Sequence, residues 1–306
     1  MKVLNSKENI AVEQKADVKI HLPFSSLRQN KKRFFFVGIF LLSTICFVVS
    51  WFMGFKDDMA IKKQQAVLQE KKQRNFHSKE TTISDNTSAG IANTEDKEYK
   101  EPEILAEYEK LYEQNKDLIG WLRIGDTVID YPVMQCVEDE NYYLSHDFYK
   151  DENKNGSLVL DSDSHAGVGI REQEYVNGSK PSTNLIIHGH TMKSGQMFGN
   201  LKLYHDREYG LSHNIIYFHS LYEKREYELI SVFYSQVYYE SEEVFKYYTF
   251  FQADTQEEFD DWYRNIKEMS LYDTGVSAKW GDEFLTLSCC AYHVNDGRFV
   301  VVAKRK

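Results

Sequence analysis

Proline and cysteine are both scarce in this sequence, with four residues of each type among 306. So few cysteines argue against a small secreted fold held by a disulfide framework, which needs more of them at wider spacing. Tyrosine and phenylalanine are abundant by contrast, with 21 and 19 residues. Because aromatic residues favour strands, this composition favours a β-rich or mixed domain over a helix bundle.

An excess of positive charge is also missing. The formal net charge is −10, although residues 1–33 carry eight basic and three acidic side chains. The rest of the chain therefore has a net charge of about −15. Proteins that bind nucleic acid present clustered cations to the phosphates, so the acidic body argues against a nucleic-acid partner.

Charged residues are absent from Phe34–Phe55, a run of 22 residues that directly follows Lys31, Lys32 and Arg33. A helix of this length spans the roughly 30 Å hydrocarbon core of a bilayer. The basic flank comes first, so we expect residues 1–33 to form a cytoplasmic tail and the body to lie outside the membrane. A cleaved signal peptide is the alternative, but the run is long and no small-residue cleavage site follows it.

Residues 56–101 are polar and contain few aromatics, and we expect them to form an extracytoplasmic stalk. Within this stalk, Ala60–Lys72 is compatible with a helix, whereas Ser78–Asp96 is typical of a flexible linker. The pattern changes at Pro102, so residues 102–306 are assigned to the folded domain.

Two helices and eight strands are predicted in this domain. Ile104–Asn115 has apolar residues at helical spacing, and Thr255–Met269 combines an apolar face with a Thr255–Glu258 capping box. Short alternating or apolar runs between turn residues predict the strands. The predicted strands are Gly120–Ile124, Val128–Val133, Ser157–Leu160, Asn184–His188, Ile215–His219, Glu226–Tyr239, Phe284–Cys290 and Arg298–Ala303. These elements indicate a β-barrel-like domain with helical decorations.

Alternation along the strand Phe284–Cys290 separates its two adjacent cysteines. One face is apolar and should point into the core, with Leu285, Leu287 and Cys289. The other face carries Thr286, Ser288 and Cys290. Cys289 is then predicted to be a small buried hydrophobe. Cys290 lies at the strand end, where a thiol can meet substrate, and is our candidate nucleophile.

A thiol acts as a nucleophile near neutral pH when a cation or an imidazole lowers its pKa from about 8.5. His190 follows the buried run Leu185–Ile187 and leads into a loop, so it is a candidate acid/base. Arg298 begins a strand after the loop Ala291–Gly297, and a hairpin would bring it beside Cys290, where it could stabilise an oxyanion. Taken singly, a structural histidine and a surface arginine are the simpler interpretations.

Taken together, these segments resemble the motifs of class B sortases, which are membrane-anchored cysteine transpeptidases of Gram-positive bacteria. Leu285–Cys290 is similar to the signature Thr-Leu-Ser-Thr-Cys, with Cys290 at the catalytic position. Gly189–Phe198 resembles the segment of the catalytic histidine, and Arg298–Val302 resembles the strand of the essential arginine. Other similar segments within residues 103–306 are Ile119–Leu122, Asp130–Val133, Tyr142–Leu144 and the helix around Trp262. Two positions depart from the family pattern: Cys289 replaces the usual Thr, and Cys136 replaces a common Gly.

The resemblance implies a mostly β fold with helices. We expect a sortase-like closed β-barrel of about eight strands, an N-terminal helix and a late inserted helix, all within the catalytic domain 102–306. Cys290 would attack the carbonyl that follows Thr in a C-terminal sorting signal, and His190 would protonate the leaving amine. An amine of a peptidoglycan precursor would then attack the thioester. Thr286 and Ser288 are the expected substrate-binding residues, and neither a cofactor nor a metal is expected.

Four alternatives stay open. A pilin-polymerising sortase would use a pilin lysine as the acceptor, and a thiol hydrolase would use water. A non-catalytic sensor or adhesin on a single membrane span has the same predicted topology. A metal site could draw on Cys289, Cys290, His188, His190 and His293. That site is disfavoured because adjacent cysteines on a strand point to opposite faces.

Overall fold

The computed structural model describes residues 24–84, 102–173, 175–176 and 179–306, and in the first range it describes side chains from residue 34 to residue 76. The contacts divide the chain into two compact units, Met1–Asp57 and Asp58–Lys306. Helix α1 (Phe24–Ser84) contributes residues to both units. Each unit is described by itself below.

The first unit contains the apolar part of α1. A helical stretch within Phe34–Phe76 has a mean hydropathy of 2.3 and is long and apolar enough to cross a membrane. None of its most apolar window is buried inside the protein. The large apolar side chains between Phe34 and Phe55 are exposed, as a surface facing lipid would be. This agrees with the predicted membrane span, whereas its orientation stays a prediction.

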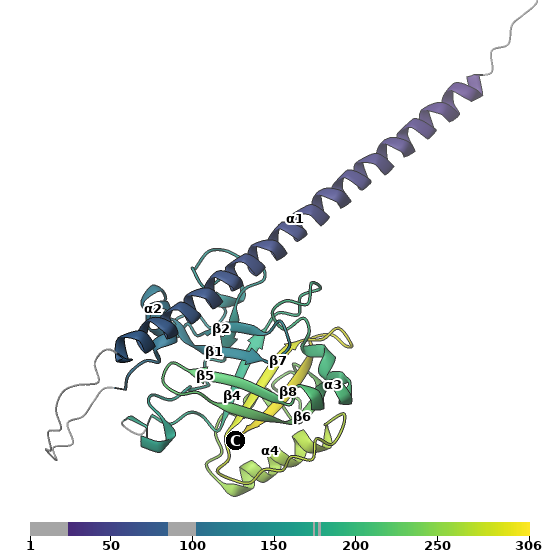
Figure 1. Ribbon diagram of the computed structural model, residues 1–306. Coiled ribbons are helices and arrows are strands. Elements are labelled where there is room, and N and C mark those ends of the chain that lie inside the picture. The colour runs from purple at the N-terminus through teal and green to yellow at the C-terminus, as the bar shows by residue number, and fades with distance from the viewer. Residues whose placement is uncertain (1–23, 85–101, 174, 177–178) are drawn as a thin grey trace, which may run out of the picture. The chain divides into compact units, whose positions relative to one another are not determined.

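The second unit is built on a closed barrel of eight strands in the order β1-β2-β3-β4-β7-β8-β6-β5 (Figure 1). The strands are β1 (Leu118–Ile124), β2 (Asp130–Met134), β3 (Leu158–Leu160), β4 (Asn184–Gly189), β5 (Ile215–Ser220), β6 (Glu226–Gln236), β7 (Phe284–Cys290) and β8 (Gly297–Arg305). The pairs β2–β3 and β4–β7 are parallel, and the other neighbours are antiparallel. The predicted barrel is therefore confirmed, and all eight predicted strands are present.

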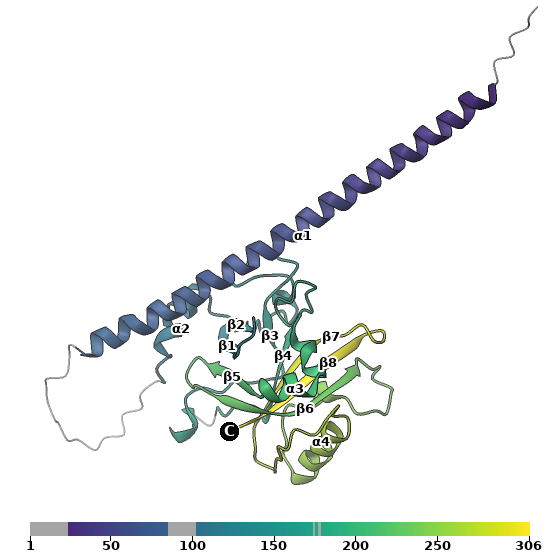
Figure 2. The ribbon, with the colours of Figure 1, turned by 45° about the vertical axis from the view of Figure 1, so that its right-hand side comes forward.

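Three clusters of buried side chains hold this unit together. The first fills the barrel with inward-facing residues of all eight strands. The second lies beneath α1 and α2 (Ala106–Gln114), on the outer face of β1 and β2. The third lies between the barrel and α4 (Gln256–Glu268), where Phe259, Trp262 and Ile266 pack on β6, β7 and β8 (Figure 2). The late helix expected from the sequence thus covers the outer face of the strand that carries Cys290.

Several short elements were not predicted from the sequence. They are α3 (Arg207–Ser212) and the 3₁₀ turns η1 (Tyr142–Leu144), η2 (Arg171–Gln173), η4 (Leu201–His205) and η5 (Tyr247–Thr249). Each is six residues or shorter. A segment of this length has too few turns to show a helical period.

The start of α4 has the predicted capping box. The Thr255 hydroxyl accepts from the Glu258 N–H, and the Glu258 carboxylate accepts from the Thr255 N–H. Thr255→Ala should therefore lower the free energy of unfolding by about 1 kcal/mol. Urea unfolding of the full chain in detergent, followed by tryptophan fluorescence, measures this change. The neighbouring Gln256→Ala is the matched control, and an equal loss in both variants would contradict the capping role.

The second half of α1 packs against the barrel. Ile61, Leu68 and Asn75 are buried, and Leu68 belongs to the cluster beneath the helix. Gln65 donates to the Val128 carbonyl at 2.9 Å, and the Lys72 ammonium lies 3.1 Å from the Asp130 carboxylate.

These contacts place residues 58–76 in the same compact unit as residues 102–306, whereas the sequence predicted a stalk as far as residue 101. The helix expected at Ala60–Lys72 is present as part of α1. The buried apolar residues Ile61 and Leu68 lie seven positions apart, so they do not form the continuous apolar stripe that would predict packing of this helix on the barrel. The linker predicted for Ser78–Asp96 is helical to Ser84, and its remaining residues lie outside those that the structure describes.

His219 on β5 is one of the residues near this helix and makes the stability of the fold depend on pH. Burial, followed by the charge of Lys224, lowers the pKa of His219 to about 4. The charged and titratable groups that face it are Lys72, Glu107, Tyr108, Arg123 and Lys224. In the unfolded chain a histidine has a pKa of about 6.5. Between these two values the unfolded state binds more protons, so acid favours unfolding.

We therefore expect His219 to lower the free energy of unfolding by about 2 kcal/mol as the pH falls from 7 to 5. The variant His219→Phe should lack this part of the pH dependence. Urea unfolding of both proteins at the two pH values measures the difference. His213→Gln serves as the control and should keep the wild-type slope. A slope that is unchanged in His219→Phe would contradict the prediction.

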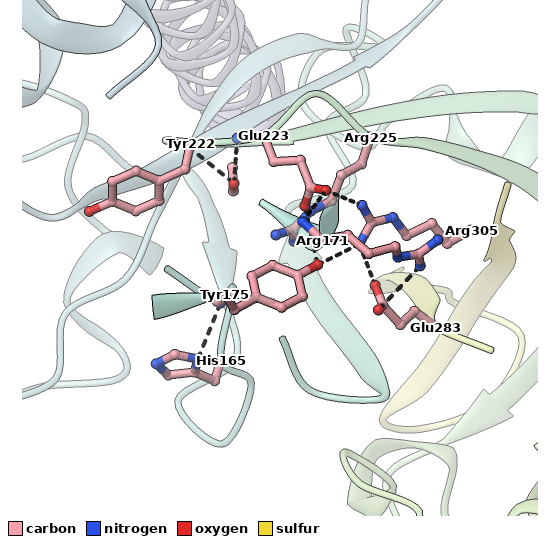
Figure 3. Close-up of polar contacts among 10 residues, drawn as sticks. His165, Arg171, Tyr175, Tyr222, Glu223, Arg225, Glu283 and Arg305 are labelled. Atoms are coloured by element: carbon pink, nitrogen blue, oxygen red, sulfur yellow. Dashed lines mark hydrogen bonds and ion pairs between the residues drawn. The ribbon is translucent and has the colours of Figure 1, made fainter. Parts of the chain in front are cut away.

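A cluster of charged side chains, which Figure 3 shows, includes residues at the ends of β7 and β8 that lie away from Cys290. The Glu223 carboxylate accepts from Arg225 Nε at 2.6 Å and also pairs with Arg305. Arg305 in turn pairs with Glu283, which also lies 3.2 Å from Arg171. Mutual pairing of this kind allows such buried charges to remain ionised.

Candidate active site

The β7–β8 hairpin brings Cys290 and Arg298 together. The two residues are directly opposite each other in the antiparallel ladder, so their side chains lie on the same face. The Ala291 N–H donates to the Gly297 carbonyl at 2.9 Å and closes the hairpin loop. A Cβ atom on Gly297 would lie 2.3 Å from the Ala291 carbonyl oxygen, so the tight loop requires glycine. The hairpin predicted from the sequence is confirmed.

The parallel pairing of β4 with β7 brings His190 to the same end of the barrel. Gly189 is the register partner of Cys289, and His190 follows it directly. Gly189 is tightly enclosed, because a Cβ atom there would lie 2.6 Å from Leu158 and from Phe198. This is the close backbone approach that a glycine at a strand end indicates.

Hydrogen bonds on both sides hold the His190 loop in place. The Thr191 hydroxyl donates to the Cys290 carbonyl at 2.6 Å, and the Phe198 N–H donates to the His190 carbonyl at 3.0 Å. The Nε2 atom of His190 lies 2.8 Å from the Leu144 carbonyl oxygen. Because a carbonyl only accepts, Nε2 must carry a proton in this contact. Nδ1 is therefore the ring atom left to exchange a proton with a substrate.

A cavity of about 300 Å³ joins the three candidate residues. Its lining includes Cys290 and Arg298 from the hairpin, His188 from β4 and His190 directly after β4. The buried Cys289 also contributes to its wall. The structure therefore brings Cys290, His190 and Arg298 to one cavity, although they lie up to 108 positions apart in the chain.

The guanidinium of Arg298 is held by its own loop. Its Nη1 atom donates to the carbonyls of Asp296 and Gly297, at 3.1 Å each. Among the residues that the structure describes, no carboxylate pairs with Arg298. Its charge is therefore available to an oxygen that becomes negative in the cavity.

The two adjacent cysteines have different surroundings. Cys289 is 2% exposed and packs with Leu285 and Leu287 inside the barrel, as the strand alternation predicts. Burial raises the pKa of Cys289 to about 11, so its thiol stays protonated at neutral pH. Cys290 is half-buried and borders the cavity. These environments favour Cys290 over Cys289 as the reactive thiol.

The polar face of β7 is more deeply buried than its alternating sequence predicts. Ser288 and Thr286 are each 1% exposed. Ser288 lines the cavity, and its hydroxyl lies 2.7 Å from the Tyr247 hydroxyl. Thr286 instead donates to Asn184 Oδ1 at 2.8 Å and is not among the residues that line the cavity. Ser288 therefore borders the cavity and Thr286 does not, and substrate binding by either residue stays a prediction.

The structure adds a histidine–aspartate pair to the cavity. His188 Nε2 lies 2.9 Å from Asp161 Oδ2, and both residues line the cavity wall. His188 was named above only as a possible metal ligand. Asp161 directly follows β3, and only the pairing of β3 with β4 brings it close to His188. The single sequence signal for Asp161 was its position directly after a short apolar strand.

Comparison with known proteins gives several relatives, although no family model matches the chain. The chain is 31% identical over 204 residues to Sortase B of Listeria monocytogenes, and the match covers 66% of this chain and 75% of the relative. It is 28% identical to Sortase B of Staphylococcus aureus, with the same shares covered. The crystal structure of sortase B from Bacillus anthracis in complex with AAEK1 matches with a TM-score of 0.54 and 30% identity. That match covers 68% of this chain and 87% of the crystallised chain.

Proposed function

Because the chain belongs to the class B sortase family, which consists of cysteine transpeptidases, we propose that Cys290, His190 and Arg298 carry out its acyl transfer. The observation that carries this proposal is the meeting of the three side chains at one cavity. A buried neighbour, Cys289, is a poor competitor for the role of nucleophile, because burial keeps it protonated.

In the first step, the Cys290 thiolate attacks the carbonyl carbon of the Thr in the sorting signal of a secreted protein. A carbon–sulfur bond forms, and the carbonyl oxygen becomes an oxyanion. The Arg298 guanidinium, which has no carboxylate partner among the described residues, stabilises that charge. The C–N bond then breaks, and His190, which took the thiol proton of Cys290 on Nδ1, gives that proton to the leaving amine. The product is a thioester on Cys290.

In the second step, an amine attacks the thioester carbonyl. His190 removes a proton from this amine, and Arg298 again stabilises the oxyanion. The C–S bond breaks, the Cys290 thiolate is restored and an amide is formed. We propose that the amine belongs to a peptidoglycan precursor, so that the reaction anchors a surface protein to the cell wall.

The proposed topology fits this chemistry. The apolar helix of the first unit would be a single membrane span, with residues 1–33 in the cytoplasm. The catalytic domain would then lie outside the cell membrane, where secreted proteins and cell-wall precursors meet. The supporting feature is the basic segment before the span.

Peptide cleavage tests the proposal. Full-length protein in detergent is incubated with fluorogenic peptides of the Asn-Pro-Gln-Thr and Leu-Pro-X-Thr-Gly types, with and without triglycine. We expect mass spectrometry to find cleavage after Thr and an amide product when triglycine is present. His190→Ala should abolish both, whereas His213→Ala, directly after α3, should retain them. An acid product alone would indicate a hydrolase. An amide formed only with a lysine side chain of a pilin would favour polymerisation.

A further inference from the structure

A second cavity, of about 250 Å³, lies on the outer face of β1 and β5, and it shares no lining residue with the Cys290 cavity. Its floor is made by two register pairs of the β1–β5 ladder, Trp121 with His219 and Arg123 with Tyr217. These four side chains share one face because alternate residues of a strand point the same way. The intervening residue of β1, Leu122, points into the barrel core.

Two helices and a turn complete the walls of this second cavity. Lys72 and Phe76 come from the docked part of α1, Tyr108 comes from α2, and Lys224 lies in the turn between β5 and β6. The docking of α1 on the barrel is therefore needed to form the cavity. A volume of about 250 Å³ is near the lower end of small-molecule sites, which are roughly 300–1,000 Å³, so one ring-sized ligand fits.

Three basic side chains in the cavity lie against aromatic rings. The Lys72 ammonium is 4.1 Å from the centre of the Trp121 ring, and the Arg123 guanidinium is 5.4 Å from the centre of the Tyr217 ring. The Lys224 ammonium is 5.2 Å from the centre of a third ring, that of Phe76. Rings that hold cations in this way orient them before a ligand arrives, which reduces the entropy lost on binding.

The charges in the cavity leave one cation uncompensated. Lys72 pairs with Asp130, and Lys224 pairs with Glu107 at 3.1 Å. The Arg123 guanidinium contacts the Tyr217 ring. Within the part of the chain that the structure describes, it pairs with no carboxylate and makes no hydrogen bond. A planar guanidinium of this kind matches a carboxylate through two parallel hydrogen bonds.

His219 adds a neutral hydrogen-bond donor beside that cation. Its Nδ1 atom lies 3.1 Å from the Tyr108 hydroxyl. Burial raises the pKa of Tyr108 well above its usual value, so the hydroxyl keeps its proton and can donate it to Nδ1 in one of the two neutral tautomers of His219. A neutral imidazole that accepts at Nδ1 must carry its proton on Nε2. Nε2 can then donate to an oxygen of a ligand in the cavity.

We propose that this second cavity binds a single sugar ring that carries a carboxylate. The carboxylate binds Arg123, a ring oxygen or hydroxyl accepts from His219 Nε2, and the apolar face of the ring lies against the aromatic walls. The sugar must carry a free carboxylate, as muramic acid without a peptide or a uronic acid does, because an amide has no charge for Arg123 to pair with. The inference does not depend on the identities proposed for the catalytic residues.

The test compares two sugars that differ by one carboxylate-bearing group. Binding of N-acetylmuramic acid and of N-acetylglucosamine to the full chain in detergent is measured by isothermal titration and by ligand-observed NMR. We expect the acid to bind at least tenfold more tightly, and Arg123→Gln should remove that difference. Lys202→Gln, an exposed cation outside the cavity, should not change it. Cys290→Ala should bind as the wild type does, because the two cavities are separate.

His219→Phe gives a second measure that keeps the aromatic ring but removes the donor. It should weaken binding of both sugars several-fold, while the preference for the acid remains. Equal binding of the two sugars, or a preference that survives Arg123→Gln, would overturn the proposal. Benzoate, which has a carboxylate on a flat ring without hydroxyls, should bind more weakly than N-acetylmuramic acid. Tighter binding of benzoate would show that the cavity selects an aromatic acid and not a sugar.

Discussion

Cys290→Ala should reduce both peptide cleavage and amide formation by roughly 10⁴-fold, whereas Cys289→Ala should keep most of the activity. The reason is the environment of the two thiols. Cys290 borders the cavity that also contains His190 and Arg298. Cys289 lies within the barrel core, where burial raises its pKa to about 11. Removing its sulfur should therefore affect packing more than chemistry.

Initial rates with the cleaved peptide of the panel measure this prediction, and thermal unfolding of each variant serves as the control for folding. Alkylation gives a readout that does not depend on turnover. Brief treatment with iodoacetamide at pH 8, followed by peptide mapping, should label Cys290 and leave Cys289 unmodified. Activity that survives in Cys290→Ala but is lost in Cys289→Ala would sink the assignment of the nucleophile, while the family membership would stand.

Glu223→Gln should lower the free energy of unfolding by about 3–5 kcal/mol, because it leaves two buried guanidinium groups without their shared carboxylate. Glu223 accepts from Arg225 and pairs with Arg305 (Figure 3). The side chain of Arg225 is fully buried, and its two Nη atoms have no hydrogen-bond partner among the described residues. Glu223 is thus the carboxylate on which the buried charge of Arg225 depends.

Urea unfolding of the full chain in detergent at pH 7 measures the effect. Glu226→Gln is the matched control, because Glu226 pairs with Lys306 and both side chains are half exposed. Loss of such a surface pair should change the stability by less than about 1 kcal/mol. Equal, small losses in both variants would mean that the Glu223 cluster does not stabilise the fold. The active-site cavity lies at the other end of β8, so the initial rate of folded Glu223→Gln should remain close to that of the wild type.

Local patterns in the sequence were sufficient for most of the barrel. Alternation and turn residues predicted the strands, and a capping box predicted the start of α4. The opposite placement of Leu287 and Ser288, and with it the burial of Cys289, also follows from alternation. These features depend on neighbours two to four positions apart, so each short segment determines them independently of the rest of the chain.

The tertiary structure decided which distant segments meet. Strands β4 and β7 are about 100 positions apart, and only their parallel pairing brings His190 to the Cys290 hairpin. The same kind of long-range contact docks α1 on the barrel, buries Thr286 beside Asn184 and joins His188 to Asp161. It also forms the second cavity and the Glu223 cluster. A local pattern shows that a face is apolar or polar, but it does not show which partner covers that face. The covering partner depends on strand order and packing across the whole domain.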